Sequence, residues 1–186
     1  MRNIKRIFIH CTASSRKTSI EQLLAEFKSR GWHAPGYHYV AMPDGRMVKL
    51  LDEEKVSNGV RGYNQSAINI AYVGGIDAKG RPTDNRTIEQ KAAIIHLLIE
   101  LRSRYPNALI MGHRDIWGAN NPKAWQKACP CFNATREYGA IKTHSSEKTK
   151  SNQALTTDLG KKKSSCIRAA TGIVASQCRM ISFSVR

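Results

Sequence analysis

The stretch Ile4-Lys5-Arg6-Ile7-Phe8-Ile9-His10-Cys11 decides the fold. β-branched and aromatic side chains dominate it, and this pattern predicts a buried β-strand over residues 4–11. Alternation along that strand directs His10 to one face of a sheet and Cys11 to the other. A second apolar run, residues 108–111, ends in the same way just before His113. The sequence therefore places two imidazoles at the ends of two buried strands.

A third side chain that can bind a metal lies in the stretch Lys127-Ala128-Cys129-Pro130-Cys131-Phe132. Two imidazoles and one thiolate would give zinc three protein ligands and leave its fourth position open, which is typical of a catalytic site. Side chains two apart in an extended segment point to the same side, so Lys127 and Cys129 are expected to face such an ion together. Cys131 is also a thiol, and spacing alone leaves open which of the two cysteines binds.

Helix and strand patterns alternate between these stretches. Two helices are predicted, one over residues 18–30 and one from Thr87 to the stop at Pro106. Each opens with a capping box, in which Thr18 pairs with Glu21 and Thr87 pairs with Gln90.

Three further strands are predicted from period-two alternation. Residues 36–42 and 47–50 form a hairpin around the turn Pro43-Asp44-Gly45, and residues 66–75 form another strand. Alternation puts Tyr37 and Tyr39 on one face, where a tyrosine is more often a packing residue than a chemical one.

The amino-acid composition differs between the first 138 residues and the rest of the chain. The 186 residues, 41% of them hydrophobic, can bury one core of ordinary size, which we expect in residues 1–138. Residues 139–186 carry nine Lys or Arg and two acidic residues without steady periodicity, so they are predicted to be a flexible basic tail. The net charge of +16 favours contact with polyanions such as cell-wall polymers, nucleic acid or a membrane surface.

Other features of the sequence restrict the class of protein. No C-x-x-C pair with distal histidines and no aromatic RNA-binding signature occurs, so no specific nucleic-acid partner is expected. The first residues lack the pattern of a signal peptide and no apolar run approaches the length of a membrane span, so we expect synthesis in the cytoplasm and no membrane insertion. Five irregularly spaced cysteines indicate reduced thiols or metal ligands rather than a disulfide framework.

Seven short motifs together carry a resemblance to a known family. By the identity of these motifs and their order along the sequence, the chain resembles the zinc-dependent N-acetylmuramoyl-L-alanine amidases. Within that family it resembles the bacteriophage lysozyme type of the amidase type 2 and peptidoglycan-recognition superfamily. The motifs are Ile-His-Cys-Thr-Ala-Ser (9–14), Gly-Tyr-His-Tyr (36–39), Pro-Asp-Gly (43–45), Gly-Tyr-Asn-Gln-Ser (62–66), Gly-Gly-Ile-Asp (74–77), Gly-His-Arg-Asp (112–115) and Lys-Ala-Cys-Pro-Cys-Phe (127–132).

The resemblance implies a fold and a set of site residues. It implies an α/β domain with a central mixed β-sheet flanked by helices and with zinc (Zn²⁺) in a surface groove. It makes His10, His113 and Cys129 the zinc ligands, and it favours Cys129 over Cys131. Tyr37 and Lys127 match the two catalytic side chains of the family.

The resemblance also implies the reaction and the partner. The expected reaction is hydrolysis of the amide bond between N-acetylmuramic acid and the L-alanine of the stem peptide, in peptidoglycan or a muropeptide. In this reaction Lys127 would stabilise the oxyanion and Tyr37 would orient water or donate a hydrogen bond. We expect a monomer that acts on the cell wall. A non-catalytic peptidoglycan-binding module is the alternative, because the superfamily includes recognition proteins, although these typically lose the cysteine ligand.

Overall fold

Five strands of the computed structural model, which describes residues 2–142, form one mixed sheet. The strands are β1 (Arg6–Cys11), β2 (Tyr39–Ala41), β3 (Met47–Lys49), β4 (Ala67–Tyr72) and β5 (Leu109–Gly112), and their order in the sheet is β3-β2-β4-β1-β5. β1 pairs in parallel with β4 and β5, and β2 pairs in parallel with β4, whereas β2 and β3 form an antiparallel hairpin. The predicted mixed sheet is confirmed.

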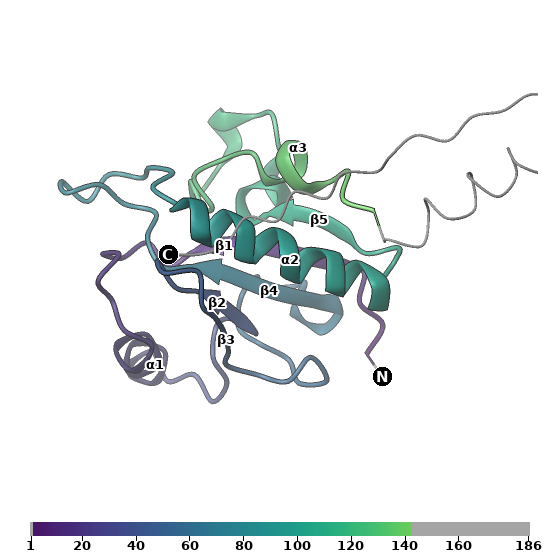
Figure 1. The fold of residues 1–186 in the computed structure, drawn as a ribbon, viewed down its shortest axis with the longest axis horizontal. Helices are drawn as coiled ribbons and strands as arrows, with labels where there is room; N and C mark the ends of the chain where they lie inside the picture. The colour runs from purple at the N-terminus through teal and green to yellow at the C-terminus, as the bar shows by residue number, and fades with distance from the viewer. Residues whose placement is uncertain (1, 143–186) are drawn as a thin grey trace, which may run out of the picture. The chain divides into compact units, whose positions relative to one another are not determined.

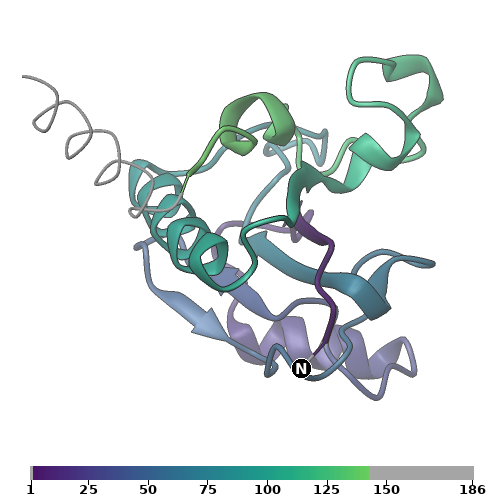
Figure 2. The same cartoon turned by 90° about the vertical axis from the view of Figure 1, so that its right-hand side faces the viewer.

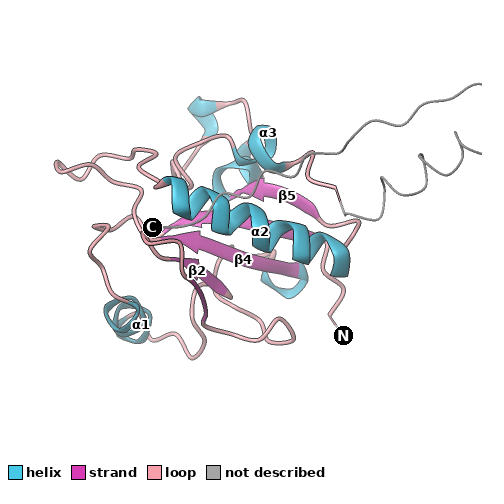
Figure 3. Ribbon diagram, in the orientation of Figure 1, coloured by secondary structure: helices cyan, strands magenta, loops and turns pink. Residues whose placement is uncertain are grey.

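Helices cover both faces of this sheet. The long helix α2 (Ile88–Arg104) crosses one face, α1 (Ile20–Ser29) lies on the other, and the short α3 (Ala134–Tyr138) lies near β5 (Figures 1 and 2). Three short 3-10 helices, coloured as helix in Figure 3, complete the described part: Asn64–Ser66, His113–Trp117 and Pro122–Ala124.

The alternation of β1 explains these two layers. Ile7 and Ile9 pack with Leu98 and other apolar side chains of α2, and Cys11 belongs to the same cluster. On the opposite face, Leu23 of α1 packs in a separate cluster with side chains of β2 and β4. His10 lies on the α1 side of the sheet, where its side chain is buried at 1% exposure and its ring lies 5.2 Å from that of Tyr37. The predicted division of the strand between the two faces is confirmed.

The helix caps match the sequence in one case and differ by one residue in the other. The capping box of Thr87 with Gln90 opens α2 as predicted. The box that opens α1 joins Ser19 to Gln22, so the prediction of Thr18 with Glu21 was wrong. The N–H group of Thr18 instead donates to Ser15 O in the preceding turn, which leaves Ser19 as the last residue with extended backbone before the helix.

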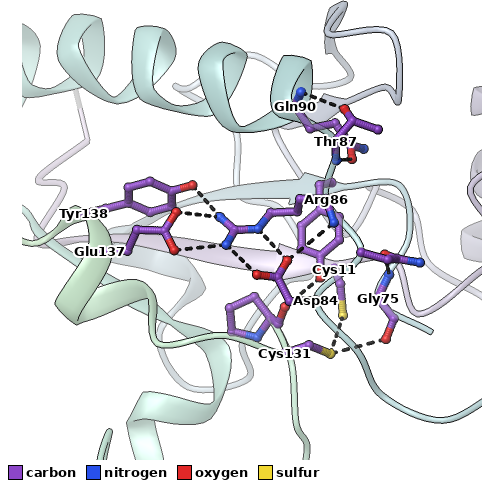
Figure 4. Close-up of polar contacts among 12 residues, drawn as sticks. Cys11, Gly75, Asp84, Arg86, Thr87, Gln90, Cys131, Glu137 and Tyr138 are labelled. Carbon is purple, nitrogen blue, oxygen red and sulfur yellow. Dashed lines mark hydrogen bonds and ion pairs between the residues drawn. The ribbon is translucent and has the colours of Figure 1, made fainter. Parts of the chain in front are cut away.

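A buried arginine fixes the segment that follows the Cys129 motif (Figure 4). The Arg86 side chain, 1% exposed, donates two hydrogen bonds to Asp84 and two to Glu137. It also donates to the hydroxyl of Tyr138, and its guanidinium carbon lies 3.2 Å from the centre of the Phe132 ring. These contacts tie α3 and the chain just after the motif to the loop that precedes α2.

The predicted tail falls almost entirely outside the described residues. Of residues 139–186 only 139–142 are described, and there Arg102 Nε donates to Ile141 O at 3.0 Å. The division of the chain at residue 138 therefore stays a prediction. Among the described helices, none combines the length and the apolar character that crossing a membrane requires.

We predict that Arg86→Met lowers the free energy of unfolding by about 2 kcal/mol, because it removes a buried cation that donates charge-assisted hydrogen bonds to two partly exposed carboxylates. Urea denaturation measures the free energy of unfolding of Arg86→Met and of a control variant, Arg81→Met. Arg81 is 71% exposed and pairs with Asp77 at the surface, so its loss is expected to cost less than about 1 kcal/mol. Equal losses in the two variants would contradict the structural role assigned to Arg86.

Candidate metal centre

Strand pairing brings the two predicted histidines together. β1 and β5 are parallel neighbours, and Ile9 pairs with Gly112, so His10 within β1 and His113 just after β5 lie at the same edge of the sheet. The rings of His10 and His113 lie 4.9 Å apart between centroids. The Cys129 thiol comes from a loop beyond this edge, and its Sγ atom lies 3.7 Å from His10 Nδ1.

The three side chains fit a zinc ion. One ligand atom from each of His10, His113 and Cys129 lies within 4.8 Å of the others. Ideal bonds of about 2.1 Å to nitrogen and about 2.3 Å to sulfur in a tetrahedral site put those two atoms about 3.6 Å apart. The 3.7 Å between His10 Nδ1 and Cys129 Sγ agrees with this separation.

Electrostatics keep both imidazoles neutral, as a metal ligand must be. Burial, together with the nearby charge of Lys127, lowers the pKa of His10 to about 4. Burial, a charge on His10 and the charge of Lys127 lower the pKa of His113 to about 3. At neutral pH each ring therefore keeps a free lone pair on one nitrogen.

The structure separates the two candidate thiols. The backbone N–H of Cys11 donates to Cys129 Sγ at 3.3 Å. The Cys131 thiol donates to Gly75 O at 3.3 Å, and a contact with Cys11 Sγ and burial raise its pKa. Both cysteines pack against the core cluster on the α2 side, but only the Cys129 thiol among the two lies with the histidines.

A cavity beside the three ligand atoms contains both predicted catalytic side chains. Tyr37 and Lys127 line it together with His10, His113 and Cys129, and side chains of α1 form its far wall. The expectation that Lys127 and Cys129 face the same side is confirmed. The structure does not test their catalytic roles, which stay predictions.

The backbone that directs Tyr37 into the cavity differs from the strand that the sequence predicted. Its ring lies 5.2 Å from the His10 ring, and its hydroxyl donates to Cys11 O at 3.4 Å. Tyr39 packs in the cluster on the α2 side, so the prediction that the two tyrosines share a face was wrong. The reason is that β2 begins only at Tyr39, and the backbone before it is irregular. Burial raises the pKa of Tyr37 well above its usual value, so the hydroxyl stays protonated and can donate.

Two residues that contact the histidines were missed in the sequence. Asn69 of β4 lies with its Oδ1 atom 2.9 Å from His10 Nε2. Trp117 stacks on His113 with ring centroids 5.7 Å apart and an angle of 15° between the planes. For Asn69 a signal did exist, since an asparagine between Ile68 and Ile70 is unusual in a buried strand.

Comparisons with known proteins agree with this geometry. The family model described as N-acetylmuramoyl-L-alanine amidase matches residues 1–132. The endolysin of Enterobacteria phage K11 is 36% identical over 133 residues, which are 70% of this chain and 83% of that protein. The Ph2119 endolysin from a Thermus scotoductus bacteriophage superposes with a TM-score of 0.55 at 29% identity, over 70% of this chain and 79% of that one. The amidase LysC from Clostridium intestinale, at 24% identity over 81% of this chain and 87% of that one, shares the fold with a TM-score of 0.58.

The family model spans well over half of the chain, and the phage relative exceeds 30% identity over most of its own length. The resemblance drawn from the seven motifs is thereby confirmed. The chain therefore belongs to the N-acetylmuramoyl-L-alanine amidase family and is an enzyme that hydrolyses an amide bond of peptidoglycan.

Proposed function

We propose that the chain cleaves the bond between the lactyl group of N-acetylmuramic acid and L-alanine, with one zinc ion held by His10, His113 and Cys129. The observation that carries this proposal is the convergence of these three ligand atoms beside a cavity that also contains Tyr37 and Lys127. When bound in such a site, zinc supplies a Lewis acid that polarises an amide carbonyl and lowers the pKa of water.

Lys127 is proposed to stabilise negative charge on the amide oxygen. Its ammonium group is close enough to both imidazoles for its charge to lower the pKa of each. A carbonyl oxygen that enters the cavity would meet this cation at the position where charge develops during attack. A preorganised donor of this kind typically contributes about 3 kcal/mol to the reaction.

Tyr37 is proposed to donate a hydrogen bond from its protonated hydroxyl. The ring is held by an edge contact with Phe27, 5.5 Å between centroids, and lies beside the ring of His10. This packing restricts the hydroxyl to the region near the three ligand atoms. There it can orient water or the amide without a change in its own charge.

The site and the charge also support the proposed partner. Peptidoglycan and muropeptides carry carboxylates, and the chain has 30 Lys and Arg residues against 14 acidic ones. The charge favours encounter with such a polyanion at the cell wall, at a rate that falls with salt. No observation in the described residues favours the alternative of a non-catalytic module, since the cysteine ligand is present beside both histidines.

The products of digestion test the proposed bond. Purified peptidoglycan treated with the protein should gain free amino groups on alanine and no new reducing sugar ends, because the bond cleaved is an amide. Chemical labelling of amino termini, followed by mass spectrometry of the soluble fragments, measures both. New reducing ends without free alanine would identify a glycosidase and contradict the proposal.

Lys127→Ala should keep its zinc and lose roughly 100-fold or more in kcat, because one preorganised donor to the oxyanion is removed. Zinc content and the initial rate of alanine release measure the two effects. Lys123→Ala is the matched control, since Lys123 is an exposed lysine of the same loop that does not line the cavity. Full activity in Lys127→Ala would remove Lys127 from the mechanism.

A further inference from the structure

We propose that Asn69 is a positioning residue that holds His10 in the tautomer with a bare Nδ1, and thereby prepares this nitrogen to bind the metal. The inference rests on the zinc centre proposed above and extends it to a residue outside the ligand set. Asn69 lies in the middle of β4, opposite Phe8 of β1 in the parallel register, and its side chain reaches His10 Nε2 at 2.9 Å.

The direction of this hydrogen bond follows from a chain of buried groups that begins at a backbone N–H. The backbone N–H of Asn69 can only donate, and it lies 3.0 Å from His38 Nδ1. His38 Nδ1 is therefore unprotonated, and its Nε2–H donates to Lys55 O at 3.1 Å. Arg2 Nη1 also lies near this nitrogen, but its two hydrogens are directed to Glu53 O and Lys55 O.

The next link orients the amide of Asn69. The backbone N–H of Val60 donates to Asn64 Oδ1 at 2.7 Å, so this oxygen is an acceptor. The atom of Asn69 that lies 3.5 Å from Asn64 Oδ1 and 2.8 Å from Ser57 Oγ is therefore the donor Nδ2. Asn69 Oδ1 then faces His10, and as an acceptor it requires a hydrogen on His10 Nε2.

The result is that the hydrogen of His10 lies on Nε2 and its lone pair lies on Nδ1. This is the nitrogen 3.7 Å from Cys129 Sγ. A partner on the other ring nitrogen fixes the tautomer and orientation of a histidine that binds a metal. Asn69 does this here through a neutral amide rather than a carboxylate.

The side-chain amide of Asn69 is buried and closely packed. His10, His38, Ser57 and Asn69 are at most 1% exposed, so water does not replace any of these bonds. A Cβ atom on Gly59 would lie 2.2 Å from Asn69 Cγ. The backbone of Gly59 is not left-handed, so its conformation does not require glycine. A side chain is excluded at this position because the Asn69 amide lies too close.

Asn69→Leu removes the acceptor and keeps the branching and the number of heavy atoms of the side chain. It is expected to weaken zinc affinity about 10-fold to 100-fold, the usual effect of losing such a partner. In the metal-free protein, long-range ¹H–¹⁵N spectra of labelled histidine should show a bare Nδ1 on His10 in the wild type and loss of this single tautomer in Asn69→Leu. Comparison with His10→Gln assigns the signal. Asn69→Asp keeps an acceptor, so it should retain the wild-type tautomer and bind zinc within about 10-fold of wild type.

Two further variants separate positioning from general damage to the fold. Gln90→Leu removes another fully buried amide, which donates to Ala41 O and Val73 O on the α2 side, and it should leave the His10 tautomer and zinc affinity unchanged. Gly59→Ala keeps every polar group but displaces the Asn69 amide, and should weaken zinc binding. If Asn69→Leu does not fold, the His10 tautomer and the zinc affinity of Gly59→Ala test the same role of Asn69.

The outcomes for the two claims are distinct. A wild-type protein that binds no zinc overturns the proposed metal centre itself. A wild-type protein that binds zinc, with Asn69→Leu or Gly59→Ala binding equally tightly and showing the same His10 tautomer, overturns only the role of Asn69.

Discussion

The parallel pairing of β1 with β5 is the constraint on which the site depends. Because Ile9 lies opposite Gly112, the next residue in each chain segment, His10 within β1 and His113 just after β5, lies at the same edge of the sheet, and the two rings meet there. Neighbouring parallel strands carry side chains to one edge without any loop having to be ordered for the purpose. Two of the three proposed ligands are therefore placed by the hydrogen bonds of the sheet, and only Cys129 depends on a loop.

That loop is itself held from the opposite side of the sheet. The Tyr72 hydroxyl donates to Pro130 O at 2.8 Å, and Arg86 packs over Phe132. The chain on both sides of Cys131 is thus attached to buried groups on the α2 side, while the Cys129 thiol lies in the cavity with the two histidines. An ion bound by these three residues would join the loop to the sheet, since the loop supplies Cys129 and the end of the sheet supplies both histidines.

Part of this arrangement could be predicted from the sequence, because it depends on the pattern of neighbouring residues. The apolar alternation of residues 4–11 gave β1 and the face of His10, and the box of Thr87 with Gln90 gave the start of α2. Cys129 was favoured over Cys131 through its place in a family motif. In the structure the Cys129 thiol lies beside both histidines, whereas the Cys131 thiol donates to Gly75 O; that Cys129 binds zinc stays a prediction.

The errors arose where tertiary contacts override local pattern. The α1 cap was assigned one residue early because the sequence offers two similar pairings, Thr18 with Glu21 and Ser19 with Gln22. In the structure Thr18 belongs to the turn that begins at Ser15, and Ser19 caps the helix. Tyr37 was given the face of Tyr39 because alternation was extended into backbone that is not a strand. Asn69 was missed because its partners His10, His38 and Ser57 are distant in the sequence.

Anomalous diffraction at the zinc absorption edge, from crystals grown with zinc, tests the central claim most directly. The account predicts one strong peak at the shared edge of β1 and β5, about 2.1 Å from His10 Nδ1 and a His113 nitrogen and about 2.3 Å from Cys129 Sγ. A peak bound by Cys131, or no peak near the two histidines, would contradict it.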